Sequence, residues 1–182
     1  FLDFGECPKP DTSFTDQEIA LVRQGDPTHK ILLTDGGEFG DWHRAAKRAD
    51  VFGHTLYRTV YMDRYINLGR VTYPLTPEWY PMRVDFTRWA IDKPELPFMD
   101  IELGLEPWTK RQIYELPLEE QLSLFSMQNF HETIDYARRT RYKAHGMWGV
   151  EWWYYLKTKH NTPDYWDAAR EVMRTGKGTL SP

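Results

Sequence analysis

The chain has 182 residues, enough for one domain with a hydrophobic core. With 41% hydrophobic and 27% charged residues, its composition is that of a folded globular protein and not of a disordered one. A formal net charge of −4 argues against nucleic-acid and anionic-membrane partners, because both attract clustered Lys and Arg.

Three further features of the composition narrow the class of protein. No apolar run approaches the length of a membrane span and no signal peptide is visible, so we expect a soluble protein, cytoplasmic or secreted. Cys7 is the only cysteine, which excludes an internal disulfide. The aromatic content is 15% with eight Trp, and such rings build either a large core or platforms for the apolar faces of ligands, sugars included.

The first elements are a helix and a strand. The chain begins at Phe1 without a Met, within what reads as an element, so we expect a piece of a longer protein. A capping box over 15–18 predicts a short helix with Ile19 and Val22 as its first buried positions, ended by Gly-Asp-Pro at 25–27. A short apolar run over 30–35 then predicts a buried strand.

The middle of the chain repeats this alternation. After a flexible turn over 36–40, Asp41 is expected to cap a second helix, and a second strand follows over 50–57. A longer loop rich in Tyr and Arg extends to about residue 73. Thr76 and Pro77 then start a third helix.

The last third supplies two more strands and two more helices. The stretch 97–108 predicts a third strand, and Pro117 begins the longest helix, which ends near 139. Residues 144–153 are predicted to form a fourth strand that passes into a loop, and 162–164 start a last helix to about 174.

Four strand–helix units in a row predict an α/β fold with a parallel sheet, either a doubly wound sheet or part of a (β/α)8 barrel. Neither the G-x-G-x-x-G fingerprint nor a P-loop is present. Each predicted strand ends on polar or aromatic residues: Asp35 and Glu38, Tyr57 and Arg58, Glu102 and Glu106, Trp148 and Glu151. Because barrel enzymes carry their functional residues at these ends, the pattern favours a half barrel of strands 5–8.

The third predicted strand ends on acids, which is unusual for a buried strand. Strict alternation would place Asp100, Glu102, Gly104 and Glu106 on one face. The simpler interpretation is a strand that runs into solvent with ordinary surface acids. The neighbouring Trp108 and the aromatic-acid clusters downstream favour a functional site.

The ordered set of strand ends resembles the C-terminal half of a clan A retaining glycoside hydrolase, a cellulase-like or β-galactosidase-like barrel. The resemblance rests on the stretches Thr34–Glu38, Phe52–Arg58, Ile101–Trp108 and Trp148–Trp153. It implies hydrolysis of β-glycosidic bonds in oligo- or polysaccharides, without cofactor or metal, and it makes Glu102 the match for the nucleophile. The family's acid/base Glu follows an Asn, and no Asn-Glu pair occurs in this sequence. We therefore expect that residue in an absent N-terminal half, with Glu6 as a weaker stand-in and the isolated chain inactive.

Several residues are predicted to bind substrate, each with an alternative. Glu106 is a rival nucleophile or holds the loop or a sugar hydroxyl, and Tyr57 either lies near the nucleophile or belongs to the core. Arg58 pairs with an acid in the site or lies on the surface, and Glu151 pairs with an Arg or binds sugar hydroxyls. Trp108 and Trp148 are candidate sugar platforms, in preference to Trp152 and Trp153. Glu38 and Trp42 either reach an outer subsite or lie on the surface.

Other interpretations stay open at this point. His54 and His145 lack the spacing of metal ligands, so a metal site is not predicted. A non-catalytic carbohydrate-binding or structural half barrel is the main alternative function, and a nucleotide-binding α/β protein is a third. Half a barrel leaves open strand edges, so we expect association with the missing half or with another copy.

Overall fold

A computed structural model of the chain describes residues 12–62 and 68–176. The opening element, Glu6, Cys7 and the expected tail beyond residue 176 therefore lie outside the described residues. Seven α-helices, one 3-10 turn and six strands make up the described part, and their order follows. The elements are α1 (Thr12–Gly25), β1 (Leu32–Asp35), α2 (His43–Arg48), β2 (Val51–Leu56), β3 (Thr59–Met62), β4 (Gly69–Thr72), α3 (Trp79–Ala90), β5 (Phe98–Gly104), η1 (Ile113–Glu115), α4 (Leu118–Leu124), α5 (Met127–Arg139), β6 (His145–Trp148), α6 (Val150–Lys159) and α7 (Asp164–Thr175).

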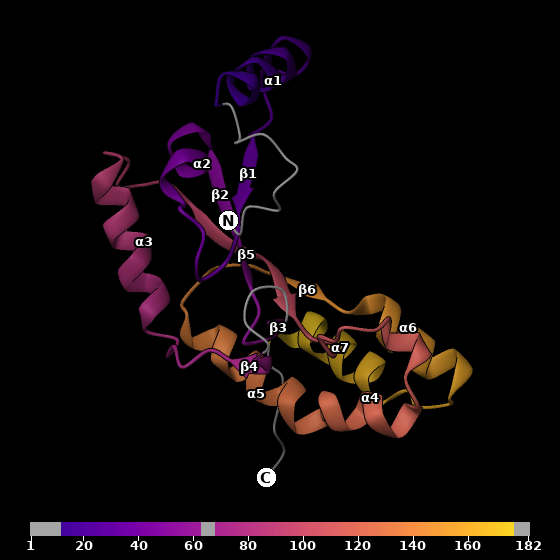
Figure 1. Cartoon of the computed structure of the whole chain (residues 1–182). Helices are drawn as coiled ribbons and strands as arrows, with labels where there is room; N and C mark the ends of the chain where they lie inside the picture. The colour runs from indigo at the N-terminus through magenta and orange to yellow at the C-terminus, as the bar shows by residue number, and fades with distance from the viewer. Residues whose placement is uncertain (1–11, 63–67, 177–182) are drawn as a thin grey trace.

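The protein is an α/β fold built on a parallel sheet, as the alternation of strands and helices predicted. The sheet has the order β1-β2-β5-β6, and each neighbouring pair is parallel (Figure 1). Among the described residues each new strand is added to the same edge, so the order shows no reversal. The strands β1 and β6 form the two edges.

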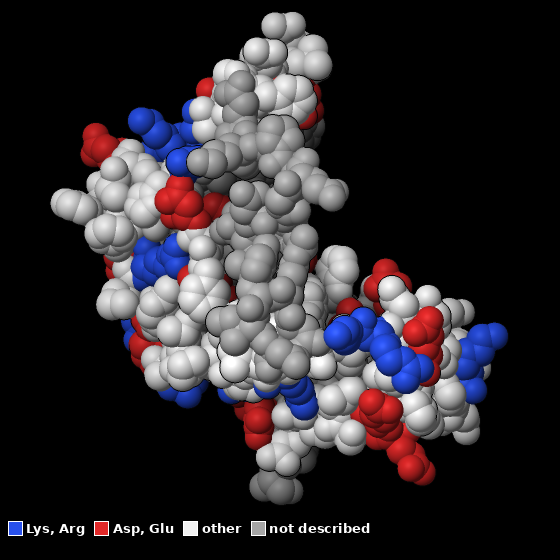
Figure 2. Space-filling model, viewed as in Figure 1, with Lys and Arg blue, Asp and Glu red and all other residues white. Residues whose placement is uncertain are grey.

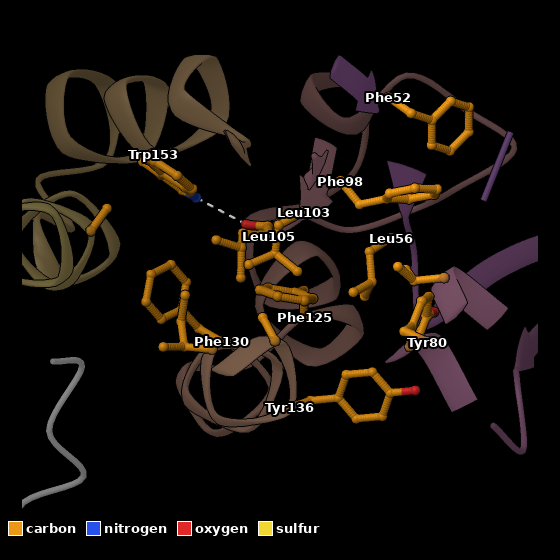
Figure 3. Packing of buried hydrophobic residues seen from close by; sticks show 14 of the residues in the cluster. Phe52, Leu56, Tyr80, Phe98, Leu103, Leu105, Phe125, Phe130, Tyr136 and Trp153 are labelled. Atoms are coloured by element: carbon orange, nitrogen blue, oxygen red, sulfur yellow. Dashed lines mark hydrogen bonds between the residues drawn. The ribbon is translucent and has the colours of Figure 1, made fainter. Parts of the chain in front are cut away.

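One face of the sheet carries the core. Phe52 and Leu56 of β2 and Phe98 and Leu103 of β5 are buried against rings from the helices, including Trp153 of α6 (Figure 3). The opposite face presents Thr55, Met99 and Ile101, which are only half-buried. On the surface shown in Figure 2, basic and acidic side chains of the described residues are interspersed.

The first helix, α1, and the first strand, β1, both differ from the prediction. Helix α1 begins three residues before the capping box and has no buried residue, and Val22 is 53% exposed. It stands off the rest of the fold in Figure 1 and is tied to it by ion pairs of Arg23 with Asp50 and of Arg48 with Asp16. Strand β1 is shorter than predicted and is half-exposed, because it lies at the edge of the sheet.

Three predicted segments have a different structure. The expected loop after β2 contains the antiparallel hairpin β3–β4. The expected long helix is two helices, because the chain is extended at Phe125 and Ser126 restarts it with its own capping box to Asn129. The aromatic run after β6 is the helix α6 and not a loop.

Two helix starts also differ from the prediction. Helix α3 begins at Trp79, and neither Thr76 nor another side chain caps it. Helix α2 follows Trp42, which has a φ of 64°, and Asp41 does not cap it with its side chain. The predicted last helix is confirmed as α7.

Candidate functional site

The carboxyl ends of β2 and β5 bring Tyr57 and Glu102 together. The two strands are parallel, with Leu56 paired to Leu103, so the residues that follow them lie at the same edge of the sheet. The Tyr57 hydroxyl donates a hydrogen bond to Glu102 Oε2 at 2.9 Å. Tyr57 was expected either near the nucleophile or in the core. In the structure its hydroxyl contacts Glu102, the predicted nucleophile.

A bulge in β5 decides which carboxylates face this edge. Strand β2 pairs His54 with Asp100 and then Thr55 with Glu102, so Ile101 is an extra residue on β5. The bulge turns the side chain of Glu102 to the face opposite Asp100. The prediction that Asp100 and Glu102 share a face is therefore wrong. Asp100 is fully buried on the helix side, where its Oδ2 lies 3.0 Å from His145 Nδ1.

Gly104 makes room for the Tyr57 ring. A Cβ atom built at Gly104 would lie 2.4 Å from Cδ1 of Tyr57, which is closer than any real contact. The other side of the site is Trp108, whose ring lies 4.7 Å from that of Tyr57 at an interplanar angle of 63°. Burial raises the pKa of Tyr57, and the negative charge of Glu102 adds to this, so the phenol keeps its proton and stays a donor.

A cavity of about 390 Å³ opens beside Tyr57, and we call it the hairpin cavity; Glu102 is not among the residues that line it. The residues that line it come from the strand ends, the hairpin β3–β4 and helix α5: Tyr57, Arg58, Thr59, Arg70, Thr72, Gly104, Glu106, Trp108, Phe125, Asn129, Glu132 and Thr133. The predicted residues Tyr57, Arg58, Glu106 and Trp108 are thus gathered in one place. The size is that of a small-ligand site.

The contributions of the hairpin and of α5 were not predicted from the sequence. Arg70 and Thr72 lie on β4, Asn129, Glu132 and Thr133 lie on α5, and all five line the cavity. The Tyr- and Arg-rich composition of 57–73 was the available signal. The strands β3 and β4 have only four residues each, so their side-chain alternation is too short to distinguish a hairpin from a loop.

Glu106 lies between the hairpin cavity and a second one. The second cavity, of about 500 Å³, is lined by Glu106, Gln112, Ile113, Tyr114, Glu151, Trp152 and Tyr155. Glu106 Oε1 accepts a hydrogen bond from the indole N–H of Trp148 at 3.0 Å. Burial raises the pKa of Glu106 and the nearby charge of Glu151 acts in the same direction, while the Trp148 bond opposes both.

The five tryptophans considered for the site differ in their exposure. Trp108 is 41% exposed and Trp148 46% exposed, whereas Trp152 and Trp153 are buried in the core. Trp42 contradicts the prediction of an outer subsite because it is completely buried. Its indole N–H bonds the carbonyls of Gly36 and Gly37, and this turn draws the ring inward.

Glu38 belongs to the same buried region as Trp42 and not to either cavity. Its carboxylate accepts a hydrogen bond from the Tyr80 hydroxyl, and only 7% of the residue is exposed. Burial raises the pKa of Glu38 despite that bond. His54 lies close by, stacked on Tyr80 and fully buried. The predicted role of Glu38 at the site is therefore wrong: this polar cluster lies on the helix side of the sheet.

The described residues provide neither a cluster of metal ligands nor a membrane-spanning helix. No three His, Cys, Asp or Glu side chains in ranges 12–62 and 68–176 come together as a metal-binding group. None of the helices in these ranges has the length and apolar character needed to cross a bilayer. No protein-family model, curated protein or solved structure matches the chain.

Proposed function

We propose that the chain is the strand 5–8 half of a (β/α)8 barrel from a retaining glycoside hydrolase, with Glu102 as its nucleophile. The observation that carries the proposal is the Tyr57–Glu102 hydrogen bond at the carboxyl edge of a parallel sheet, where Tyr57 also lines a cavity of ligand size. In barrel enzymes that edge holds the active site. The sheet order supports the barrel, because the units of a barrel succeed one another without the reversal of a doubly wound sheet.

The Tyr57 hydrogen bond suits a carboxylate that must attack. It fixes one oxygen of Glu102 in place, and among the described residues the other oxygen has no hydrogen-bond partner. That oxygen is available to bond the anomeric carbon of a sugar. The leaving oxygen departs with a proton from a second acid, and water then hydrolyses the glycosyl ester with net retention of configuration.

The second acid must lie about 5 to 5.5 Å from the nucleophile. Glu106 is poorly placed for this role because it is four residues further along an extended chain and is bound by Trp148. We propose that the acid/base residue comes from a polypeptide segment outside these 182 residues. The sheet edges β1 and β6 would be the seams with that segment or with another copy of the chain.

The substrate we propose is a β-linked oligo- or polysaccharide. Trp108 and Trp148 are both partly exposed; Trp108 lines the hairpin cavity with Glu106, and Trp148 bonds Glu106, which supports more than one sugar subsite. Glu106 and Glu151 are acceptors for sugar hydroxyls at the second cavity.

An activated substrate tests the nucleophile without the missing acid, because a dinitrophenolate leaves without a proton. The chain is mixed with dinitrophenyl β-glycosides, and dinitrophenolate release is followed by absorbance. We expect a burst of up to one equivalent in the wild type and none in Glu102→Gln, with the exposed Glu119→Gln as the matched control. Equal release from wild type and Glu102→Gln would refute the assignment. Tight saccharide binding without any burst would favour the non-catalytic alternative.

A further inference from the structure

The hairpin cavity contains two arginines that have no acidic partner among the described residues. Arg58 follows β2, Arg70 lies on β4, and both line the cavity. Most other arginines of the described chain pair with a carboxylate: Arg23, Arg44, Arg48, Arg88, Arg111, Arg138, Arg139 and Arg174. Neither Arg58 nor Arg70 forms an ion pair with any residue of ranges 12–62 and 68–176.

The acids of the same cavity form no ion pair with these arginines. Glu106 accepts the indole N–H of Trp148, and Glu132 accepts the side-chain amide of Gln128 at 2.8 Å. Each carboxylate bonds a neutral group and keeps its charge, but neither forms an ion pair with Arg58 or Arg70. The guanidinium groups keep their hydrogen-bonding capacity for a ligand.

Arg58 is held in a defined position. Its Cζ atom lies 4.6 Å from the centre of the Tyr136 ring, which supports the flat face of the guanidinium. The Tyr136 hydroxyl donates to the Leu75 carbonyl at 2.9 Å, so the ring itself is fixed. The backbone carbonyl of Arg58 accepts from the Tyr73 N–H at 2.9 Å. A guanidinium stacked in this way has its N–H edges free to bind a planar anion through two bonds.

Arg70 adds a second positive charge from the hairpin. It lies two residues from Thr72 on β4, and residues two apart on a strand share a face. The Thr72 hydroxyl lies 2.9 Å from that of Thr59, which fixes the register of the hairpin at the cavity. Arg70 and the two threonines thus present a cation and hydroxyls on one wall.

We propose that the saccharide bound in the hairpin cavity carries an anionic group, held by Arg58 and Arg70. This inference rests on the proposed function and specifies its substrate class. The group is a uronic-acid carboxylate or a sulfate ester, since both present oxygens that match a guanidinium. It belongs to a sugar toward the hairpin, because the charges of Glu102 and Glu106 would repel it near the nucleophile.

Binding of matched oligosaccharides to the whole chain tests the inference. Calorimetry compares a neutral β-linked oligosaccharide with its uronate and its sulfated counterparts of the same length. We expect one of the acidic ligands to bind at least about tenfold more tightly than the neutral one, as expected for a charge-assisted hydrogen bond. The acidic ligand that binds more tightly shows whether the anionic group is a carboxylate or a sulfate ester. Added salt should weaken that ligand more than the neutral one.

Variants separate the two arginines from general surface charge. Arg70→Gln, an exposed position, and Arg58→Gln should each remove most of the preference for the acidic ligand. Arg44→Gln, at an exposed position away from the cavity, should leave the preference intact. Thermal melts identify any variant that has lost its fold, and the exposed Arg70 site provides the test if Arg58→Gln unfolds.

Three results would overturn the inference. Equal affinity for neutral and acidic oligosaccharides would refute it and leave the proposed function standing. Absence of binding by all three ligands, together with no dinitrophenolate burst, would refute both. A preference for acidic ligands that survives in both Arg58→Gln and Arg70→Gln would place the anion elsewhere.

Discussion

Acid should destabilise this fold through His54. The imidazole lies in β2, fully buried, and is stacked between Trp42 at 4.8 Å and Tyr80 at 5.5 Å. Its Nδ1 lies 2.9 Å from the Thr55 carbonyl, and its Nε2 has no partner among the described residues. Burial lowers the pKa of His54 from its ordinary 6.5 to about 4, and the charges of His145 and Arg83 act in the same direction.

The direction and size of the effect follow from proton linkage. Between the two pKa values the unfolded chain binds a proton at His54 that the folded chain does not, so stability falls as the pH falls. From about pH 7 to about pH 5 this loss amounts to about 2 kcal/mol. The contribution is fully present above the unfolded pKa and is lost progressively toward about pH 4.

The carboxyls of the same cluster act in the opposite direction. Burial raises the pKa of Glu38 and of Asp100. Protonation of these carboxyls therefore stabilises the fold as the pH falls through their raised pKa values. The measurement therefore compares the wild type with His54→Phe, which keeps an aromatic ring and carries no charge. Urea unfolding at both pH values should show the wild type losing about 2 kcal/mol more than the variant.

The exposed His29 provides a matched control for His54. His29→Gln changes an exposed imidazole and should leave the pH dependence of the wild type intact. If wild type and His54→Phe lose stability in parallel between the two pH values, His54 does not carry the acid sensitivity and the burial argument is wrong.

The remaining predictions concern the site and the core. Tyr57→Phe removes the donor to Glu102, and it should slow the burst by about tenfold to a hundredfold with little effect on the melt; an unchanged rate would contradict the role of the hydroxyl. Gly104→Ala puts a Cβ against the Tyr57 ring and should destabilise the chain by about 1 to 3 kcal/mol in urea unfolding and slow the burst as well. Wild-type behaviour would mean that the ring has room to move. Trp153→Phe leaves the buried Leu105 carbonyl without its donor, and a loss of about 1 to 3 kcal/mol in urea unfolding is expected; no loss would show that another group replaces the indole.

The strands and their parallel arrangement were predictable because both depend on local patterns. Short apolar runs between Gly, Pro and Asp residues mark β2 and β5, and the helices between them force parallel crossovers. The proximity of Tyr57 and Glu102 follows from the same reasoning, since neighbouring parallel strands end at one edge. A sequence with this pattern therefore predicts that Tyr57 and Glu102 meet.

The rest depends on tertiary contacts that no local pattern records. The bulge at Ile101 breaks the alternation of β5, so Asp100 turns to the helix side and pairs with His145. Trp42 follows a glycine-rich turn and an acid, as a surface residue would, yet the carbonyls of that turn hold its indole in the core. The start of helix α6 was predicted as a loop, although Trp152 and Leu156, both buried in the structure, are four residues apart as on one helix face.

The hairpin is the largest part of the site that the sequence did not predict. Arg70 reaches the cavity only because β4 pairs back on β3, with Thr72 opposite Thr59. Pairing of two four-residue strands depends on the surface against which they pack and not on their own pattern.

Covalent labelling tests the central claim, that Glu102 is the nucleophile, most directly. A fluorosugar with a dinitrophenolate leaving group forms a glycosyl ester that is slow to hydrolyse, and it needs no acid catalyst to react. Peptide mass spectrometry of the treated chain should find one fluorosugar on the peptide that contains Glu102, and Glu102→Gln should stay unlabelled. Label on Glu106 or on another carboxylate, with Glu102 unmodified, would contradict the account.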